Sequence, residues 1–264
     1  MIRLLKIELN KVLYSKAFWM IFGLYLALIG PAAYAMDKIF KGSSVSVNGQ
    51  PNIAEMLLQG FSIFKFPYVW HNMSYLMGWF QLILAVIVIT LVTNEYSYKT
   101  LRQNIIDGMS KWEIVIAKEL VILLLSVLSL LILVAVALFL GESVEGVSRM
   151  EGMRVLIGYF LSTFFYLNLA YFLSSILKRS GLTIGFLLIY SVVELIVGTQ
   201  LPEKIASFLP LKLLGKMIPN PMGILMGNDI TPDLSGTTIA ALFVYLGLMV
   251  YGIYFLLKRG HAAK

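Results

Sequence analysis

The chain contains no cysteine and only two histidines, His71 and His261, and these shortages exclude several kinds of chemistry. Without cysteine there are no disulfides and no thiolate metal sites, and two histidines alone do not complete a histidine-based metal site. The phosphate-binding sequence GxxxxGK[ST] is also absent, so nucleotide chemistry would have to come from another polypeptide. We therefore expect this chain itself to bind no metal and no cofactor.

Charged residues are also scarce. Only 13% of the 264 residues are charged and 59% are hydrophobic, whereas soluble domains carry about 25% charged residues. At about 20 residues for each crossing, the apolar runs are long enough for six transmembrane helices. They predict an all-α membrane protein with a single domain over residues 1–264 and spans at about 17–35, 75–92, 113–140, 154–177, 181–199 and 236–257.

Residues 2–14 predict an amphipathic helix that lies in the membrane interface. One face would carry Ile2, Leu5, Leu9, Val12 and Leu13, and the other would carry Arg3, Lys6, Asn10 and Lys11. A basic face opposite an aliphatic stripe is typical of interfacial helices, and a plain extension of the first span is the alternative. The sequence Ala33-Tyr34-Ala35 imitates a signal-peptide cleavage site, but the long amphipathic lead and the later spans argue against cleavage.

The distribution of charge predicts the orientation of the spans. With the N-terminus in the cytoplasm, 13 of the 21 Lys and Arg residues lie inside and 8 lie outside, as the positive-inside rule requires. The net charge of +7 then reflects topology and anionic lipid rather than nucleic-acid binding. Both termini are expected inside. Residues 37–72 form an outer loop, in which Trp70 and His71 suit the membrane interface, and 201–233 form short outer helices.

Residues 94–109 form a polar region between the second and third spans. Asn94 is predicted to cap a short helix, which Gly108 ends. Ser110 and Glu113 have the spacing of a capping box, which would restart a helix that runs into the third span. The region therefore predicts a short helix on the membrane surface, a glycine break and a second helix that enters the membrane.

Two functions suit such a region: a simple connection, or a docking site for a cytoplasmic partner. A helix tied to a span at each end can transmit a partner's movement into the membrane, so docking is the interpretation that we develop; a solvated helix face is the alternative for each residue. The residues expected to contact the partner are Glu95, Tyr98, Thr100, Leu101, Arg102, Asn104 and Ile105. The residues expected to set the geometry of the turn are Asp107, Gly108, Ser110 and Glu113.

Two polar residues within the spans are candidates for a translocation path. Glu194 lies in the fifth span, where a carboxylate is costly and is a functional candidate by default. It is only about 7–8 Å from the outer end of the helix by helical rise, so solvation at the outer mouth or a hydrogen bond between helices is the alternative. Asn168 in the fourth span is the second candidate, and interhelical hydrogen bonding is its alternative role.

The stretch EYSYKTLRQNIIDGMSKWEIVIAK resembles the coupling region of type-2 ABC exporter permeases. The family's acidic residue, Thr-Leu pair, turn residue and span lysine correspond to Glu95, Thr100-Leu101, Gly108 and Lys118. The start, LLKIELNKVLYSKAFW, resembles the family's entry helix. FPYVWHNMSYLMGWF resembles the outer entry to the second span in the bacitracin-resistance-like branch, particularly as found in Bacteroidota. The resemblance covers most of the chain.

This resemblance implies a permease subunit of an ATP-binding cassette exporter in the bacterial cytoplasmic (inner) membrane. Two copies, or this chain and a relative, would pair as a homodimer or heterodimer, and each would receive one of two ATPase subunits. ATP and Mg would bind to those ATPase subunits, so the chain itself would not be an enzyme. The substrate would be a peptide or antibiotic, a lipid-like molecule or an ion. The alternatives are a membrane assembly or anchoring factor and an intramembrane enzyme.

Overall fold

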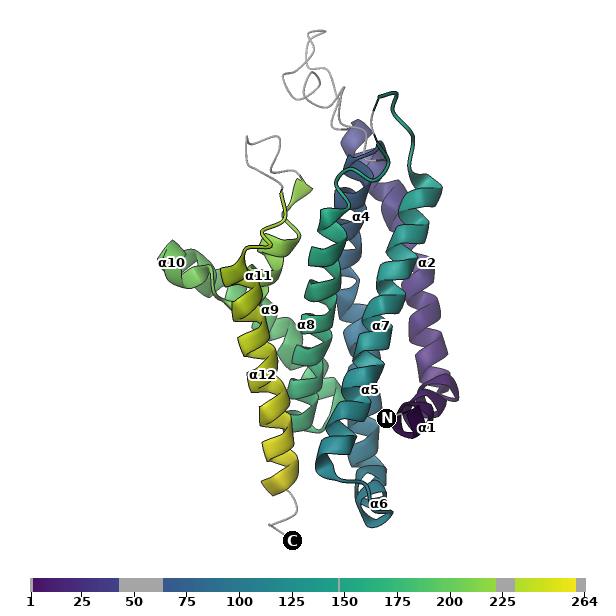
Figure 1. Ribbon diagram of the computed structural model, residues 1–264, viewed down its shortest axis with the longest axis vertical. Helices are drawn as coiled ribbons and strands as arrows, with labels where there is room; N and C mark the ends of the chain where they lie inside the picture. Colours follow the sequence, from purple (N-terminus) through teal and green to yellow (C-terminus); the bar gives the residue numbers. More distant parts are fainter. Residues whose placement is uncertain (1, 43–63, 147, 222–230, 260–264) are drawn as a thin grey trace.

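The computed structural model describes residues 2–42, 64–146, 148–221 and 231–259 (Figure 1). Within these residues the chain is helical, which confirms the predicted all-α class. The helices are α1 (Ile2–Leu13), α2 (Lys16–Gly42), α4 (Tyr68–Trp79), α5 (Gln81–Ser97), α6 (Thr100–Ile106), α7 (Lys111–Leu140), α8 (Arg154–Leu177), α9 (Ser180–Gln200), α10 (Glu203–Ala206), α11 (Pro210–Met217) and α12 (Gly236–Arg259). Most of the predicted outer loop and His261 lie outside the described residues.

Five of the described helices, α2, α7, α8, α9 and α12, are long and apolar enough to cross a membrane. A sixth crossing forms if α4 and α5 are one span, whose halves are inclined by 42°. This bent pair begins at Tyr68, whereas the sequence placed the start of the second span at Tyr75. The protein is therefore a multi-pass membrane protein.

The bend between α4 and α5 lies at Phe80, the one residue between them. There two backbone hydrogen bonds span three residues, from Phe80 N to Met77 O (3.1 Å) and from Ile83 N to Phe80 O (3.0 Å). This i→i−3 pattern makes a tighter turn than the α-helix. The next residue, Gln81, is buried and donates through Nε2 to Thr163 Oγ1 of α8 at 3.0 Å. The hydrogen bond to α8 holds the bend in place.

Helix α8 is the centre of the bundle. It packs against α4, α5, α7, α9, α11 and α12, and 72% of its most apolar stretch is buried. Gly158 allows α11 to approach α8 closely, because a Cβ atom there would lie 2.4 Å from the carbonyl oxygen of Met217 in α11.

Buried hydroxyl groups add polar links between helices. Ser129 of α7 hydrogen-bonds to both Tyr25 of α2 (3.0 Å) and Tyr159 of α8, the interhelical bonding that hydrocarbon favours.

One local prediction, the helix cap at Asn94, was wrong. Trp70 and His71 are buried inside α4, where Trp70 Nε1 donates to Arg149 O at 2.7 Å and His71 Nε2 lies 2.7 Å from Pro219 O; their place at the membrane interface stays a prediction. Asn94 does not cap a helix, because α5 continues through it to Ser97. In α1, the Val12 side chain is 4% exposed and the neighbouring Leu13 side chain is 49% exposed; the interfacial position of α1 stays a prediction.

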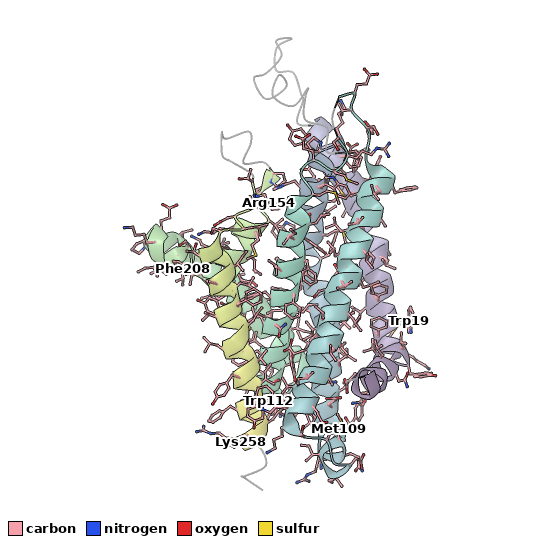
Figure 2. The ribbon with its side chains drawn as sticks, viewed as in Figure 1. Trp19, Met109, Trp112, Arg154, Phe208 and Lys258 are labelled. Atoms are coloured by element: carbon pink, nitrogen blue, oxygen red, sulfur yellow. The ribbon has the colours of Figure 1, made fainter. Side chains whose placement is uncertain are left out.

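The bundle has two ends of different construction. At one end lie α1, α6 and the last turn of α12 (Figure 1), which we call the α6 end. Met109, Trp112 and Lys258 all lie there in Figure 2. The short helices α10 and α11 lie toward the opposite end, near the first turn of α12 (Figure 1), which we call the α11 end. The short helices predicted for 201–233 correspond there to α10 and α11, and residues 222–230 lie outside the described residues.

Candidate functional site

The short helix α6 lies across the α6 end between two long helices. Lys99 precedes it in the left-handed conformation, with φ of 57°, which turns the chain sharply out of α5. Seven residues later the helix ends, and Gly108 adopts a φ of 92°, a conformation that glycine takes without steric penalty. These two corners set α6 at an angle to both long helices.

The start of α7 has the capping box that the sequence predicts. Ser110 Oγ accepts from the Glu113 N–H at 3.2 Å, and Glu113 Oε2 accepts from the Ser110 N–H at 2.7 Å. This reciprocal pair satisfies two N–H groups that would otherwise lack partners at the helix start. Trp112 in the same turn stacks on Tyr254 of α12, with ring centroids 4.2 Å apart. The chain that leaves α6 is therefore held within the first turn of α7, by the capping box of α7 and by the contact with α12.

The residues predicted to contact a partner divide into three groups. Tyr98, Thr100 and Arg102 are exposed, and Tyr98 is 75% exposed. Leu101, Asn104 and Ile105 are half-buried, and the two aliphatic side chains pack against the core. Glu95 is different, because it belongs to α5 and is only 5% exposed. Its carboxylate faces the inside of the bundle, contrary to the expectation that it meets a partner.

Asp107, the remaining turn residue, is exposed and accepts from Gln103 Nε2 at 3.0 Å. This hydrogen bond stabilises the last turn of α6.

Sequence reasoning overlooked Ile106, whose side chain is 70% exposed. Together with Tyr98 it places two large apolar groups on the outer surface of this end. The overlooked signal was the pair of consecutive isoleucines: on a helix, only one of two neighbours can face the bundle.

Glu95 belongs to a set of four alternating charges, which we call the charge cluster: Glu8, Lys11, Glu95 and Lys118. Lys118 Nζ of α7 donates to Glu95 Oε1 of α5 at 2.8 Å and also to Glu8 of α1. Lys11 Nζ donates to Glu8 Oε1 at 2.6 Å and to Glu95 Oε1 at 2.8 Å. Three members are 5% exposed or less, and the Lys11 side chain is 30% exposed. Two carboxylates and two ammonium groups thus neutralise one another.

The charge cluster favours the ionised forms of Glu8 and Lys11. Burial alone would raise the pKa of Glu8, but the charges and hydrogen bonds of Lys118 and Lys11 outweigh it and lower that pKa below its ordinary value of 4.5. Burial alone would lower the pKa of Lys11, and here Glu95 and Glu8 reverse the effect and raise it above 10.5. Removing one member would leave the buried cluster with one uncompensated charge, which is strongly destabilising. The charge cluster therefore clamps α1 to α5 and α7.

The two translocation candidates lie in different parts of the bundle. Glu194 of α9 is 5% exposed, and its Oε1 atom accepts from the backbone N–H groups of Leu211 (2.5 Å) and Lys212 (3.0 Å) in the first turn of α11. Asn168 of α8 is fully buried; its Nδ2 donates to Phe164 O at 3.1 Å, and its side chain adjoins Glu119 of α7. Glu194 therefore anchors a short helix, and Asn168 lies between two spans. Among the residues described, no three His, Asp or Glu side chains gather as a metal site would require.

The helices from α4 to α12, with the short helix between two spans, match a known family. The sequence model of the family described as "ABC-2 family transporter protein" matches residues 68–257. The chain belongs to this family. It is thus a membrane-spanning permease component of an ABC transporter, a kind of subunit that works with ABC ATPase subunits in the lipid bilayer. No curated protein matches the chain. The match begins at α4, so the α1 half of the charge cluster lies outside it.

Proposed function

We propose that this ABC-2 family chain is the permease of an exporter and that α6 is where an ATPase subunit docks. The observation that carries the proposal is the exposed surface of the α6 region between two spans, where Arg102 and Ile106 of α6 and Tyr98, just before α6, are all exposed. Exposed aromatic, aliphatic and arginine side chains are the types that dominate protein interfaces. Thr100 extends this face, while Leu101, Asn104 and Ile105 form its inner rim.

The charge cluster and the capping box give this docking site a connection to the membrane. A push on α6 reaches α7 through Gly108 and the turn capped by Ser110 and Glu113. It also reaches α5 through Lys99, because Lys99 lies two residues after the end of α5, the helix that carries Glu95. Because the charge cluster joins α5, α7 and α1, the three helices would move together. Glu95 thus has a transmitting role instead of a contact role.

The remaining features of the complex follow from the same proposal. The α6 end faces the cytoplasm of a bacterial cell, with both termini inside and the α11 end outside, and the membrane is the inner membrane. Two permease chains pair as a homodimer or with a relative, and two ATPase subunits bind ATP and Mg. The bacitracin-resistance-like branch is the branch we favour, because residues 66–80 resemble its outer entry. The adjacent reading frame is expected to encode a soluble chain with GxxxxGK[ST].

The docking proposal is tested by a matched pair of substitutions. Ile106→Asp places a charge on the exposed face of α6, and Ile205→Asp makes the same change on α10, where the isoleucine is 59% exposed. We expect Ile106→Asp to reduce co-purification of the ATPase at least about tenfold, a loss typical of a central interface residue, and Ile205→Asp to leave it unchanged. Both variants should insert and elute normally. Equal recovery of the ATPase with both would show that α6 is not the docking site.

A further inference from the structure

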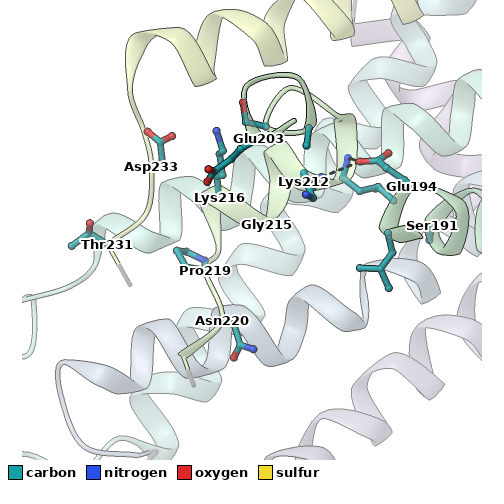
Figure 3. Close-up of a pocket in the computed structure, with 14 residues that line it drawn as sticks. Ser191, Glu194, Glu203, Lys212, Gly215, Lys216, Pro219, Asn220, Thr231 and Asp233 are labelled. Atoms are coloured by element: carbon teal, nitrogen blue, oxygen red, sulfur yellow. Dashed lines mark hydrogen bonds between the residues drawn. The ribbon is translucent and has the colours of Figure 1, made fainter. Parts of the chain in front are cut away.

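Two cavities lie side by side at the α11 end, beside the helix that Glu194 anchors. Figure 3 shows residues that line the larger of the two. The larger one, of about 730 Å³, is lined by α9, α10, α11 and the approach to α12, and we call it the head cavity. The smaller one, of about 310 Å³, lies between α4, α5, α8, α9 and α11, and we call it the tail cavity. Both sizes fall in the range of ligand sites. Ser191, Leu211 and Gly215 line both cavities, so the two share a wall.

The head cavity is charged with both signs. Its ionisable lining residues are Glu194, Glu203, Lys212, Lys216 and Asp233. The fold itself uses several of these charges: Glu194 accepts from α11, Lys212 Nζ donates to Gly198 O at 2.5 Å, and Asp233 accepts from Ser235 and Thr238. Among the described residues, Lys216 Nζ and the Glu203 carboxylate form no hydrogen bond and no close salt bridge, although the charge of Lys216 acts on Asp233, so both can accept a ligand.

Asp233 can still take part in binding. Hydrogen bonds from Ser235 hold the pKa of its carboxyl below the ordinary value of 3.8, so it carries a negative charge at neutral pH. Its backbone N–H donates to the Lys216 carbonyl at 3.0 Å, which fixes its position beside the available lysine. The head cavity therefore offers the ammonium group of Lys216 and two carboxylates outside the span helices.

The tail cavity has a different chemistry. Its lining is mainly aromatic and aliphatic and includes Tyr75, Trp79, Leu82, Tyr166, Leu188, Leu214 and Ile218. Trp79 is 71% exposed and stands edge-on to Tyr75, with ring centroids 6.4 Å apart. This cavity suits a hydrocarbon chain, while the head cavity next to it suits charged groups. The pair has the polarity of an amphiphile.

We propose that the two cavities together bind one amphiphile with a zwitterionic head, in which an ammonium and a phosphate group are joined to an acyl chain. The phosphate lies at Lys216, and the ammonium group lies between Glu203 and Asp233. The acyl chain passes Ser191 and occupies the tail cavity beside Trp79. The identification of this molecule as cargo rests on the transport function proposed above, but its binding does not.

Binding is tested on the full-length chain in maltoside micelles without an ATPase. The probes are lysolipids with a bromine-labelled acyl chain, which quenches tryptophan fluorescence on contact, carrying a phosphoethanolamine, a phosphoglycerol or an uncharged maltose head. We expect saturable quenching by the phosphoethanolamine probe and affinities at least about tenfold weaker for the other two. Trp79→Phe should remove most of the quenching, because Trp79 lines the tail cavity.

Matched substitutions locate the two parts of the ligand. Lys216→Gln should weaken phosphoethanolamine binding at least about tenfold, and Lys204→Gln, an exposed lysine of α10 outside both cavities, should not. Ser191→Phe should block the junction and abolish binding, whereas Val192→Phe, at an exposed neighbour outside both linings, should preserve it. Glu203→Gln, at an exposed position, provides a head-cavity variant that leaves folding undisturbed and should also weaken binding.

The proposal fails if the three probes bind alike, if the cavity variants bind like their controls, or if only a cationic amphipathic peptide binds. A separate assay addresses cargo: with the ATPase present, the phosphoethanolamine probe should stimulate ATP hydrolysis. If the ATPase does not associate with the chain but the probe still binds with the expected variant pattern, the proposed function has failed and the amphiphile site stands.

Discussion

At the α6 end, four side chains of alternating charge hold three helices together, whereas at the α11 end a single carboxylate, Glu194, accepts from two backbone N–H groups. The first arrangement consists wholly of ionisable side chains, so one substitution leaves one buried charge uncompensated. The second uses backbone donors that only a substitution by proline removes. The comparison indicates that the α6 end is rigid only while every charge is present, and that the α11 end depends on one acceptor.

The largest effect is expected from Lys118→Met. It leaves the buried carboxylates of Glu8 and Glu95 with only Lys11 as partner, and breaking a buried ion pair in this way costs about 3–5 kcal/mol. The measurement is reversible unfolding of the full chain in mixed micelles. Lys111→Met, in the same helix but outside any ion pair of the described residues, is the control and should change stability by less than about 0.5 kcal/mol. Equal losses would mean that the charge cluster does not clamp α1.

Glu194→Leu probes the other end and is expected to come second. It leaves the N–H groups of Leu211 and Lys212 without their acceptor, at a cost of about 2–4 kcal/mol by the same unfolding measurement. Glu194→Gln keeps an oxygen that can accept, so its loss should stay near 1 kcal/mol and assembly should remain intact. If Gln and Leu are equally harmful, the charge rather than the acceptor is what α11 requires. Unchanged transport by Glu194→Gln would exclude the carboxylate charge from the translocation path.

Gly158→Ala tests how closely α11 approaches α8. The new Cβ would lie 2.4 Å from the Met217 carbonyl oxygen, so a backbone must move, and such overpacking costs about 1–3 kcal/mol. Gly247→Ala in α12 is the matched change, because nothing lies within 4 Å of its Cβ; it should be neutral or stabilise by up to about 1 kcal/mol, since alanine favours helix. A neutral Gly158→Ala would show that α11 can shift freely.

The charge cluster should release α1 in acid and in strong alkali, and it should hold α1 unchanged at neutral pH. Because the pKa of Glu8 is lowered in the folded state, its contribution is fully present above 4.5 and is lost as the pH falls through the lower folded value. The raised pKa of Lys11 gives a contribution that is fully present below 10.5 and is lost as the pH rises through the higher folded value. A spin label on Leu13→Cys should therefore gain mobility only in acid or strong alkali. Gain of mobility between these limits would contradict the assignment.

Local patterns in the sequence predicted local structure well. The capping box of Ser110 and Glu113 and the turn at Gly108 depend on a few neighbouring residues, and both are present. The apolar runs gave the all-α membrane class because bilayer thickness fixes helix length. Asn94 failed as a cap because a capping residue is only a preference, and packing on α8 extends α5 past it.

The charge cluster could not be predicted in the same way. Glu95 and Lys11 are 84 residues apart, and Glu8 and Lys118 are 110 residues apart, so only the packing of α1 against α7 brings them together. For the same reason Glu194 looked like an isolated charge in a span, since its donors belong to a helix that begins 16 residues later. The docking role of α6 stays a prediction.

Lys99 at the start of α6 has a consequence for the energy stored at this corner. A residue with a side chain in the left-handed conformation costs roughly 1–2 kcal/mol more than glycine would, and Lys178 at the end of α8 adopts the same conformation, with φ of 55°. The ammonium group of Lys178 lies 5.5 Å from the ring of Tyr96, three residues before Lys99. Two corners in the left-handed conformation are thus held side by side, and a rotation of α6 that returned Lys99 to a right-handed conformation would recover this local cost at the end of α5.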